Sequence, residues 1–294
     1  MRVDQTLIIE AAISPFRADA PVADASGVVE EAIACIAAGS AVVHHHHDQR
    51  LERDAAIERL IDTCRAILDV RPGALLYPGI LSGRTGAEHT AHLAPMAEAG
   101  VLGMAPLDPG AAVPYDLDDD GLPTGHGWVW NSFSTSKKVA NSMLEHAVPL
   151  ALGVYEPVQL RWALAMEAAG KLVPGTMVKL YFGGNNSLFR LGKPAINFGL
   201  PPTPQALDMY LSMMEGSNLP WMVGVMGDDV LDLPLARHAL ERGGHIRVGI
   251  EDLGQSDTTT NVATVERAVA LAAEVGRTVA NTDNVLAVLA GSQR

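Results

Sequence analysis

The amino-acid sequence predicts a (β/α)8 barrel, the TIM barrel, as a single domain over residues 1–294. Short apolar runs rich in β-branched residues alternate with amphipathic stretches along nearly the whole chain, which is the pattern of repeated strand-helix units around a parallel sheet. Eight such runs occur, and eight strands that are each followed by a helix fit a closed barrel. No low-complexity linker divides the chain, so we expect one domain.

The predicted strands are short apolar segments bounded by turn residues. In chain order they are residues 7–14, 41–46, 74–79, 101–106, 149–155, 176–182, 221–227 and 245–250. Helices are expected at residues 54–68, 85–100, 133–147, 158–172, 203–216, 233–244 and 261–276. Several of these segments end in the glycine that commonly follows a helix C-terminus. Residues 278–291 predict a further helical turn or two that covers the bottom or the side of the barrel.

Two connections are long, residues 107–132 after the fourth strand and residues 183–204 after the sixth. Both are rich in glycine, proline, asparagine or aspartate, and loops of this length in a compact domain are usually lids or binding loops. Both follow strand C-terminal ends, the face where barrel active sites lie. Arg190 and Lys193 in the second loop could meet the phosphates of a coenzyme, or the loop could be a solvated lid.

Composition limits the classes of partner. The net charge of −13 argues against a nucleic-acid or anionic membrane surface. The N-terminus lacks a signal-peptide pattern, and no segment approaches about 18 uninterrupted apolar residues, so we expect a soluble, cytoplasmic protein. Cys35 and Cys64 lie in apolar, helix-like stretches, where free cysteine is commonly a small buried hydrophobe.

The most conspicuous local feature is the run of four histidines from His44 to His47, at the end of the second predicted strand. Because side chains alternate along a strand, His44 and His46 share one face and His45 and His47 the other. Two imidazoles at the C-terminal end of one strand suit a divalent metal. They could equally be satisfied by loop and solvent contacts, so a metal site requires a third ligand from another strand.

The eighth strand offers that ligand. Arg247 and Glu251 lie on one face by alternation, and Asp252 begins the following loop. In a closed barrel this strand end lies close to the second strand, so His44, His46 and Glu251 could form a site with an open coordination position, typical of catalytic zinc. The alternative is that Arg247 and Glu251 merely pair within the barrel.

The segments AAGSAVVHHHHDQR and GGHIRVGIED, with the helical sequence that follows the second, resemble the β-keto acid cleavage enzyme family, whose best-known activity is 3-keto-5-aminohexanoate cleavage. The similarity of order runs from about residue 7 to residue 290. The resemblance also fixes the phase of the histidine run, because a register slip of one residue would exchange the two pairs. His45 and His47 stand where the family usually has apolar residues.

The resemblance implies a TIM barrel that binds zinc through His44, His46 and Glu251. It implies that a β-keto acid reacts with acetyl-CoA to yield an acyl-CoA and acetoacetate. In this reading Asp252, with Arg247, removes a proton to create a carbon nucleophile; the alternative role for Asp252 is that of a helix N-cap. The family tends to form homotetramers, so a homo-oligomer is expected. Another divalent ion, such as iron, manganese or cobalt, also suits this ligand set.

The chain departs from the family pattern around the substrate. Pro15 and Arg17 replace a glycine and an acidic residue after the first strand, and Tyr77 and Pro78 replace hydroxyl residues after the third. Other departures are Asp228 and Asp229 after the seventh strand, Leu253 after Asp252, and a fifth strand without acidic residues. Arg17 would favour a negatively charged substrate group and Asp228 would disfavour one.

Two other functions stay open at this level. HxH in a barrel also occurs in metal-dependent hydrolases of the amidohydrolase type, which draw further histidines from later strand ends. Here the other histidines, namely His89, His92, His126, His146 and His238, lie in predicted helices or loops. The second alternative is a metal-binding barrel without turnover, since many substrate-binding positions differ.

Overall fold

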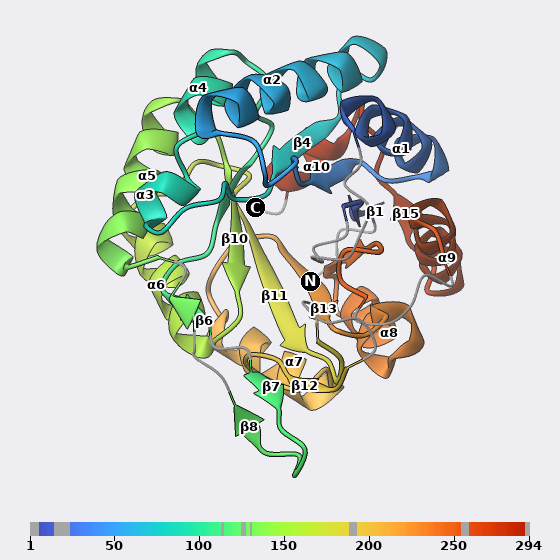
Figure 1. Ribbon diagram of the computed structural model, residues 1–294. Helices are drawn as coiled ribbons and strands as arrows, with labels where there is room; N and C mark the ends of the chain where they lie inside the picture. The colour runs from blue at the N-terminus through green and yellow to red at the C-terminus, as the bar shows by residue number, and fades with distance from the viewer. Residues whose placement is uncertain are drawn as a thin grey trace.

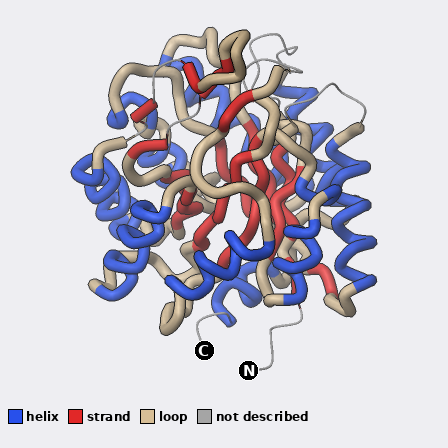
Figure 2. Tube along the Cα trace, turned by 90° about the horizontal axis from the view of Figure 1, so that it is seen from below, coloured by secondary structure: helices blue, strands red, loops and turns tan. Residues whose placement is uncertain are grey.

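The computed structural model describes residues 6–14, 24–112, 115–124, 128–129, 131–187, 193–253 and 259–291. Parallel strands surround a central axis and helices surround the strands (Figures 1 and 2). The barrel strands are β2 (Ile9–Ala12), β3 (Val42–His45), β4 (Leu75–Pro78), β5 (Ala105–Leu107), β10 (Leu150–Val154), β11 (Met177–Gly183), β13 (Trp221–Met226) and β14 (His245–Val248). All eight predicted strands are therefore present, and the TIM-barrel prediction is confirmed.

The strands form an eight-stranded sheet in the order β4-β3-β2-β14-β13-β11-β10-β5. Its two end strands also meet, because the backbone N–H groups of Gly103 and Met104 both donate to Leu76 O, at 2.9 and 3.3 Å. A Cβ at Gly103 would lie 2.8 Å from Leu76 N, so only glycine allows this close approach. The fourth strand was predicted at residues 101–106, but in the structure it begins only at Ala105. Gly103 and Met104, which precede it, instead donate to Leu76 O and so close the barrel.

Helices cover the outside of the barrel (Figure 2). They are α1 (Ala25–Ala38), α2 (Arg53–Val70), α3 (Gly86–His89), α4 (Leu93–Glu98), α5 (Phe133–Glu145), α6 (Pro157–Ala168), α7 (Pro204–Met213), α8 (Pro234–Glu241) and α9 (Asn261–Glu274), with the 3-10 turn η1 (Val230–Asp232) before α8. The helix predicted at 85–100 is in fact two short helices. Thr85 and Glu88 form a capping box that starts α3, and the second helix begins after His92. Within the described residues, no helix is long and apolar enough to span a membrane.

Strand alternation separates two apolar layers. In β11, Val178, Leu180 and Phe182 pack in the large core between barrel and helices. Met177, on the opposite face, belongs to a second cluster inside the barrel. Helix α10 (Val285–Gly291) contributes buried residues to this inner cluster. The prediction that residues 278–291 cover the barrel is thus confirmed, and α10 packs on its inner apolar layer.

The two long connections pair with each other. The loop after β5 contains β6 (Ala111–Ala112), β7 (Tyr115–Leu117), β8 (Pro123–Thr124) and β9 (Trp128–Val129), and the loop after β11 contains β12 (Ala195–Ile196). Strands β12, β7 and β8 form a three-stranded antiparallel sheet. The hairpin of β7 and β8 extends outward beyond the helices in Figure 1. Short strands β1 (Thr6–Leu7) and β15 (Thr278–Val279) pair separately.

Candidate active site and metal centre

The histidine run alternates as the sequence predicts. His44 pairs with Ala12 of β2 and with Tyr77 of β4, and its ring lines a cavity inside the barrel. His45 points outward, where its Nε2 lies 3.5 Å from the Sγ atom of Cys64 in α2. Cys64 is a buried free thiol, and burial raises its pKa to about 12. The contact shows that His45 faces the helices, whereas His44 and His46 face the cavity, and it does so independently of the family resemblance.

Glu251 reaches the histidines because the chain bends sharply after β14. Gly249 has a φ of 139°, a left-handed value that favours glycine. A Cβ on this residue would also lie 2.1 Å from Ala12 O. The bend allows Glu251 N to donate to the same carbonyl at 3.4 Å, which brings the glutamate beside β3.

The three predicted metal ligands meet at one point. His44 Nε2 and His46 Nε2 lie 3.2 Å apart, and Glu251 Oε1 lies 3.2 and 3.3 Å from them. Ligands about 2.0 Å from a tetrahedral zinc ion are separated by roughly 3.3 Å, so this triangle fits one face of such a site. Among the described residues, these three side chains form a group whose ligand atoms all lie within 4.8 Å of one another, close enough to hold one metal ion.

The protonation states also suit a metal. Burial lowers the pKa of His44 to about 4, so its ring is neutral at physiological pH. Burial opposes ionisation of Glu251, but Arg247 and the two histidines outweigh this effect and hold its pKa well below the ordinary value. Within the described part of the chain, Glu251 Oε2 is buried and has no hydrogen-bond partner. A neutral imidazole at His44 and an ionised carboxylate at Glu251, with the His46 ring beside them, are therefore arranged to bind a divalent cation.

Arg247 is the centre of a buried ionic network. Its Nε and Nη2 atoms donate to the two oxygens of Asp252, each at 2.8 Å. Nη2 also donates to Glu251 Oε1 at 2.6 Å, and Nη1 donates to Glu10 Oε1 at 2.9 Å and to the Tyr77 hydroxyl at 3.3 Å. The pairing of Arg247 with Glu251 was predicted as an alternative to metal binding, and the geometry allows both.

Asp252 is buried beside this network. Burial and the neighbouring carboxylates raise its pKa to about 6, against the opposing effect of Arg247. Asp252 is not a helix N-cap, because Thr260 caps α9. Glu251 and Asp252 thus have opposite pKa shifts, as two adjacent carboxylates with different roles require.

Sequence reasoning missed four residues of the site. Glu10 and Lys179 lie on β2 and β11 and form a buried ion pair. Tyr77 replaces a hydroxyl residue of the family pattern, and its phenol hydroxyl donates to Glu10 Oε1 at 2.5 Å. Asp108, after β5, lines the cavity. The available signal was a charged residue inside an apolar strand, at Glu10 in LIIEAAIS and at Lys179 in TMVKLYF.

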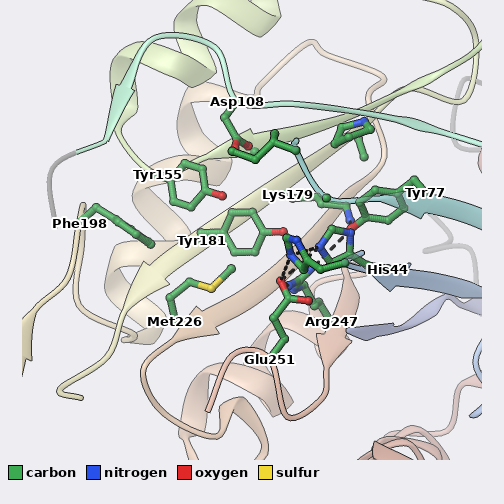
Figure 3. A pocket seen from close by; sticks show the side chains of 16 residues that line it. His44, Tyr77, Asp108, Tyr155, Lys179, Tyr181, Phe198, Met226, Arg247 and Glu251 are labelled. Atoms are coloured by element: carbon green, nitrogen blue, oxygen red, sulfur yellow. Dashed lines mark hydrogen bonds and ion pairs between the residues drawn. The ribbon is translucent and has the colours of Figure 1, made fainter. Parts of the chain in front are cut away.

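The cavity has a volume of about 110 Å³, which limits it to a small molecule or part of one. The metal ligands and Lys179 lie on one side, and the opposite wall is aromatic and apolar (Figure 3). In that wall, Tyr155 stacks on Tyr181 at a centroid distance of 4.8 Å and meets Phe198 edge-on at 4.4 Å. The wall therefore favours an uncharged substituent over most of its surface.

Asp108 is the acidic group of this wall. A Cβ on Gly153 of β10 would lie 2.1 Å from Asp108 Oδ1, so the glycine leaves room for the carboxylate. Burial raises the pKa of Asp108 to about 6, although Lys179 and a hydrogen bond with Tyr155 oppose the shift. The fifth strand lacks an acidic residue, but an acidic group from the end of the neighbouring strand stands beside it.

Two departures from the family pattern have structural roles. Asp228 accepts hydrogen bonds from Asn185 N at 2.9 Å and from the Asn186 amide at 2.7 Å, so it anchors the loop after β11. Asp229 caps η1 and pairs with Arg267 at 2.6 Å. Asp228 is not among the residues that line the cavity, and the expectation that it disfavours a negative substrate group stays a prediction.

Pro15, Arg17, His126 and Arg190 lie outside the described residues. Lys193 is exposed. Among the described histidines, His89 and His238 lie in helices α3 and α8, away from the triad. The extra strand-end histidines of an amidohydrolase-type site are therefore not found among the residues that the structure describes.

Comparison with known proteins bears directly on this site. The family model described as beta-keto acid cleavage enzyme matches residues 7–290. The chain belongs to the beta-keto acid cleavage enzyme family. The matched range contains the three candidate ligands His44, His46 and Glu251, as well as Arg247 and Asp252. The resemblance inferred from the sequence is confirmed.

Individual relatives are more distant. The 3-oxoadipate:acetyl-CoA acetyltransferase of Cupriavidus necator is 27% identical over 157 residues, which cover 51% of this chain and 50% of that protein. The chain thus spans about half the length of this curated relative. The apo structure of ObcA has a TM-score of 0.68 at 14% identity, covering 90% of this chain and 64% of that one.

A dihydropteroate synthase from Yersinia pestis, solved with a sulfonamide drug, has a TM-score of 0.53 at 12% identity and covers 94% of each chain. At such low identity, the solved structures support the barrel fold alone.

Proposed function

We propose that this protein cleaves a β-keto acid with acetyl-CoA, giving an acyl-CoA and acetoacetate. The observation that carries the proposal is the meeting of His44, His46 and Glu251 in the wall of a small cavity, beside the Arg247–Asp252 pair. Family membership supports the reaction class. The name of the Cupriavidus necator relative supports acetyl-CoA as the co-substrate, and ObcA has been solved with a C4-CoA adduct and oxalate.

We propose His44, His46 and Glu251 as the ligands of a zinc ion. A bound divalent cation would supply Lewis acidity at the carbonyl of the keto acid. Glu251 stays ionised for this role because Arg247 and the histidines lower its pKa. Other divalent ions also suit two imidazoles and one carboxylate, so metal analysis must accompany the activity assay.

Asp252 is the proposed base. Its carboxylate takes a proton from the carbon between the keto and carboxylate groups, and the electron pair of that C–H bond attacks the thioester carbonyl. The thiolate of coenzyme A leaves, then adds to the original keto carbon, and the carbon-carbon bond beside it breaks. The departing carbon regains a proton, which completes acetoacetate. A pKa near 6 leaves Asp252 ionised at neutral pH yet basic enough to act.

Arg247 positions this base. It binds both oxygens of Asp252, and each oxygen keeps a lone pair for a proton. The aromatic wall of Tyr155, Tyr181 and Phe198 would face the substituent of the keto acid.

The test is a thioester-exchange assay with acetyl-CoA and a panel of β-keto acids that carry apolar, carboxylate or ammonium substituents. The expected result is formation of acyl-CoA and acetoacetate in equal amounts with at least one member of the panel. His46→Ala, which removes a ligand, should abolish it, and His45→Ala, the matched outward-facing histidine, should not. No exchange by metal-loaded wild type across the panel would overturn the proposal.

A further inference from the structure

Lys179 is a buried cation on the metal side of the cavity. It lies on β11 between Gly153 of β10 and Met222 of β13, and its side chain is only 2% exposed. Its Nζ atom donates to Glu10 Oε2 and to the Tyr77 hydroxyl. Lys179 lines the cavity (Figure 3). A lysine this deeply buried inside an enzyme barrel requires an explanation, because desolvating an ammonium group is costly.

One explanation is that Lys179 only neutralises Glu10. Glu10 is fully buried and lies two residues before Ala12, which pairs with His44, so it is deeper in the barrel than the metal ligands. However, Arg247 already contacts Glu10 Oε1 at 2.9 Å, and Tyr77 donates to the same oxygen. Glu10 therefore has a cation and a hydrogen bond without Lys179.

Counting donors distinguishes the two cations. An arginine has five N–H groups and a lysine ammonium has three. Arg247 makes five hydrogen bonds, with Asp252, Glu251, Glu10 and Tyr77 as acceptors. All of its donors are thus engaged before any substrate arrives, and it has none left for a substrate oxygen.

Lys179 differs in this respect. Its hydrogen bonds within the described residues use two of its three N–H groups, on Glu10 and Tyr77. Tyr77 remains protonated, since burial and Glu10 raise its pKa well above the ordinary value. Burial lowers the pKa of Lys179 only to about 8, because Glu10 opposes the shift. Lys179 therefore remains a cation at neutral pH, with one donor to spare.

That donor lies beside the metal ligands. The Lys179 Nζ atom is 3.9 Å from the centre of the Tyr77 ring, and the same ring lies 4.5 Å from the ring of His44. Figure 3 shows Lys179, Tyr77 and His44 together on one side of the cavity, facing the aromatic wall. A substrate oxygen held near the ligand triad would thus be close to the ammonium group.

We infer that Lys179 is a catalytic residue that donates its third N–H group to the keto oxygen of the β-keto acid, the oxygen that gains negative charge when the adjacent carbon loses its proton. The inference rests on the proposed function. The proton stays on nitrogen throughout, so Lys179 stabilises charge and is not the base. A fixed donor in a water-poor site is effective because it needs no reorganisation when the charge develops. Glu10 and Tyr77 hold the ammonium group in place.

The test uses the metal-loaded protein and two variants, Lys179→Met and the double variant Glu10→Gln with Lys179→Met. Lys179→Met removes the charge and all three donors and leaves Glu10 with one cation fewer. The double variant removes both charges of the ion pair. It should therefore restore any stability that Lys179→Met loses because the Glu10 carboxylate lacks its lysine partner. The probes are turnover of a β-keto acid with acetyl-CoA, and binding of malonate, which resembles the keto acid but cannot react.

We expect Lys179→Met to lower kcat by about 100- to 1000-fold, the usual effect of losing one oxyanion donor. Malonate affinity should fall by roughly 10- to 100-fold, as for loss of a hydrogen bond between charged groups. The double variant should regain stability in urea but neither turnover nor malonate affinity. Recovery of both in the double variant, or unchanged malonate affinity in Lys179→Met, would overturn the inference.

Malonate binding needs no turnover. A wild type that is inactive on every keto acid would therefore count against the proposed function, while loss of malonate affinity in Lys179→Met would still support the contact with Lys179. The metal content of each variant is measured in parallel, and it should equal that of the wild type because Lys179 is not a ligand.

Discussion

Replacement of Gly79 by alanine should weaken metal binding without touching a ligand. Gly79 follows β4, and a Cβ built on it would lie 2.0 Å from Cε1 and 2.2 Å from Nδ1 of the His46 ring. Gly79 is not among the glycines with positive φ, so alanine can adopt its backbone conformation. Its N–H donates to His45 O at 2.8 Å and can continue to do so. The methyl group therefore acts on the ring of His46.

The size of the displacement follows from these distances. Carbon atoms pack at about 3.5 Å, so the ring must retreat by about 1.5 Å from its position 2.0 Å from the new Cβ. Metal-ligand distances tolerate changes of about 0.2 Å. His46 Nε2 would thus leave the triangle that it forms with His44 and Glu251. We expect metal affinity to fall at least as far as when a supporting group is lost, by about 10- to 100-fold.

The assay is competition for zinc against a chromophoric chelator, with wild type, Gly79→Ala, His46→Ala and the double variant. If the methyl group acts only through His46, it should have no further effect in the His46→Ala background. Thermal unfolding of each variant checks that the barrel is intact. Wild-type affinity in Gly79→Ala, or an equal loss with and without His46, would refute the steric argument.

Two further predictions concern stability. His245 Nδ1 accepts a hydrogen bond from Ile8 N at 3.0 Å, and burial lowers its pKa to about 3. The unfolded chain binds this proton below its ordinary pKa of about 6.5, so stability should fall as the pH drops from about 6.5 towards 3, by roughly 2 kcal/mol at pH 5. The variant His245→Gln keeps an acceptor but does not titrate. Between pH 7.5 and pH 5, its free energy of unfolding in urea should therefore fall by roughly 2 kcal/mol less than that of the wild type. An identical pH dependence in the two proteins would contradict this role of His245. Arg247→Met should cost about 3–5 kcal/mol in the same assay, because it leaves Asp252 buried without a cation, and an unchanged free energy of unfolding would show that the network is not stabilising.

The sequence predicts the eight strands and the placement of His44 and His46 on one face because both depend on local periodicity. Alternation alone separates His44 and His46 from His45, and the structure bears this out in the contact between His45 and Cys64. Glu251 could be chosen because a closed barrel brings the ends of its second and eighth strands near each other. The bend at Gly249 that completes the approach was not predicted.

The polar layer inside the barrel was harder to predict. Glu10 and Lys179 lie 169 residues apart in the chain, and each occurs in a strand that otherwise looks apolar. Their pairing depends on the register across the whole barrel, which no local pattern encodes. The same applies to the five hydrogen bonds of Arg247, whose acceptors come from two strands and a loop.

The long loops were predicted as lids or binding loops, but their small sheet was not. Strands β7 and β12 contain three and two residues, too few for a period of two to be recognised. They form because two distant loops meet. The split of the helix predicted at 85–100 had a local signal in the Thr85–Glu88 capping box, which the amphipathic pattern concealed.

The most direct test of the metal centre is the metal content of three proteins prepared in the same way: wild type, His46→Ala and His45→Ala. His46 contributes a ligand atom to the triad, whereas His45 faces Cys64 outside the barrel. We predict one divalent ion per chain in wild type and in His45→Ala, and almost none in His46→Ala. Equal metal content in wild type and His46→Ala would contradict the site on which the proposed reaction depends.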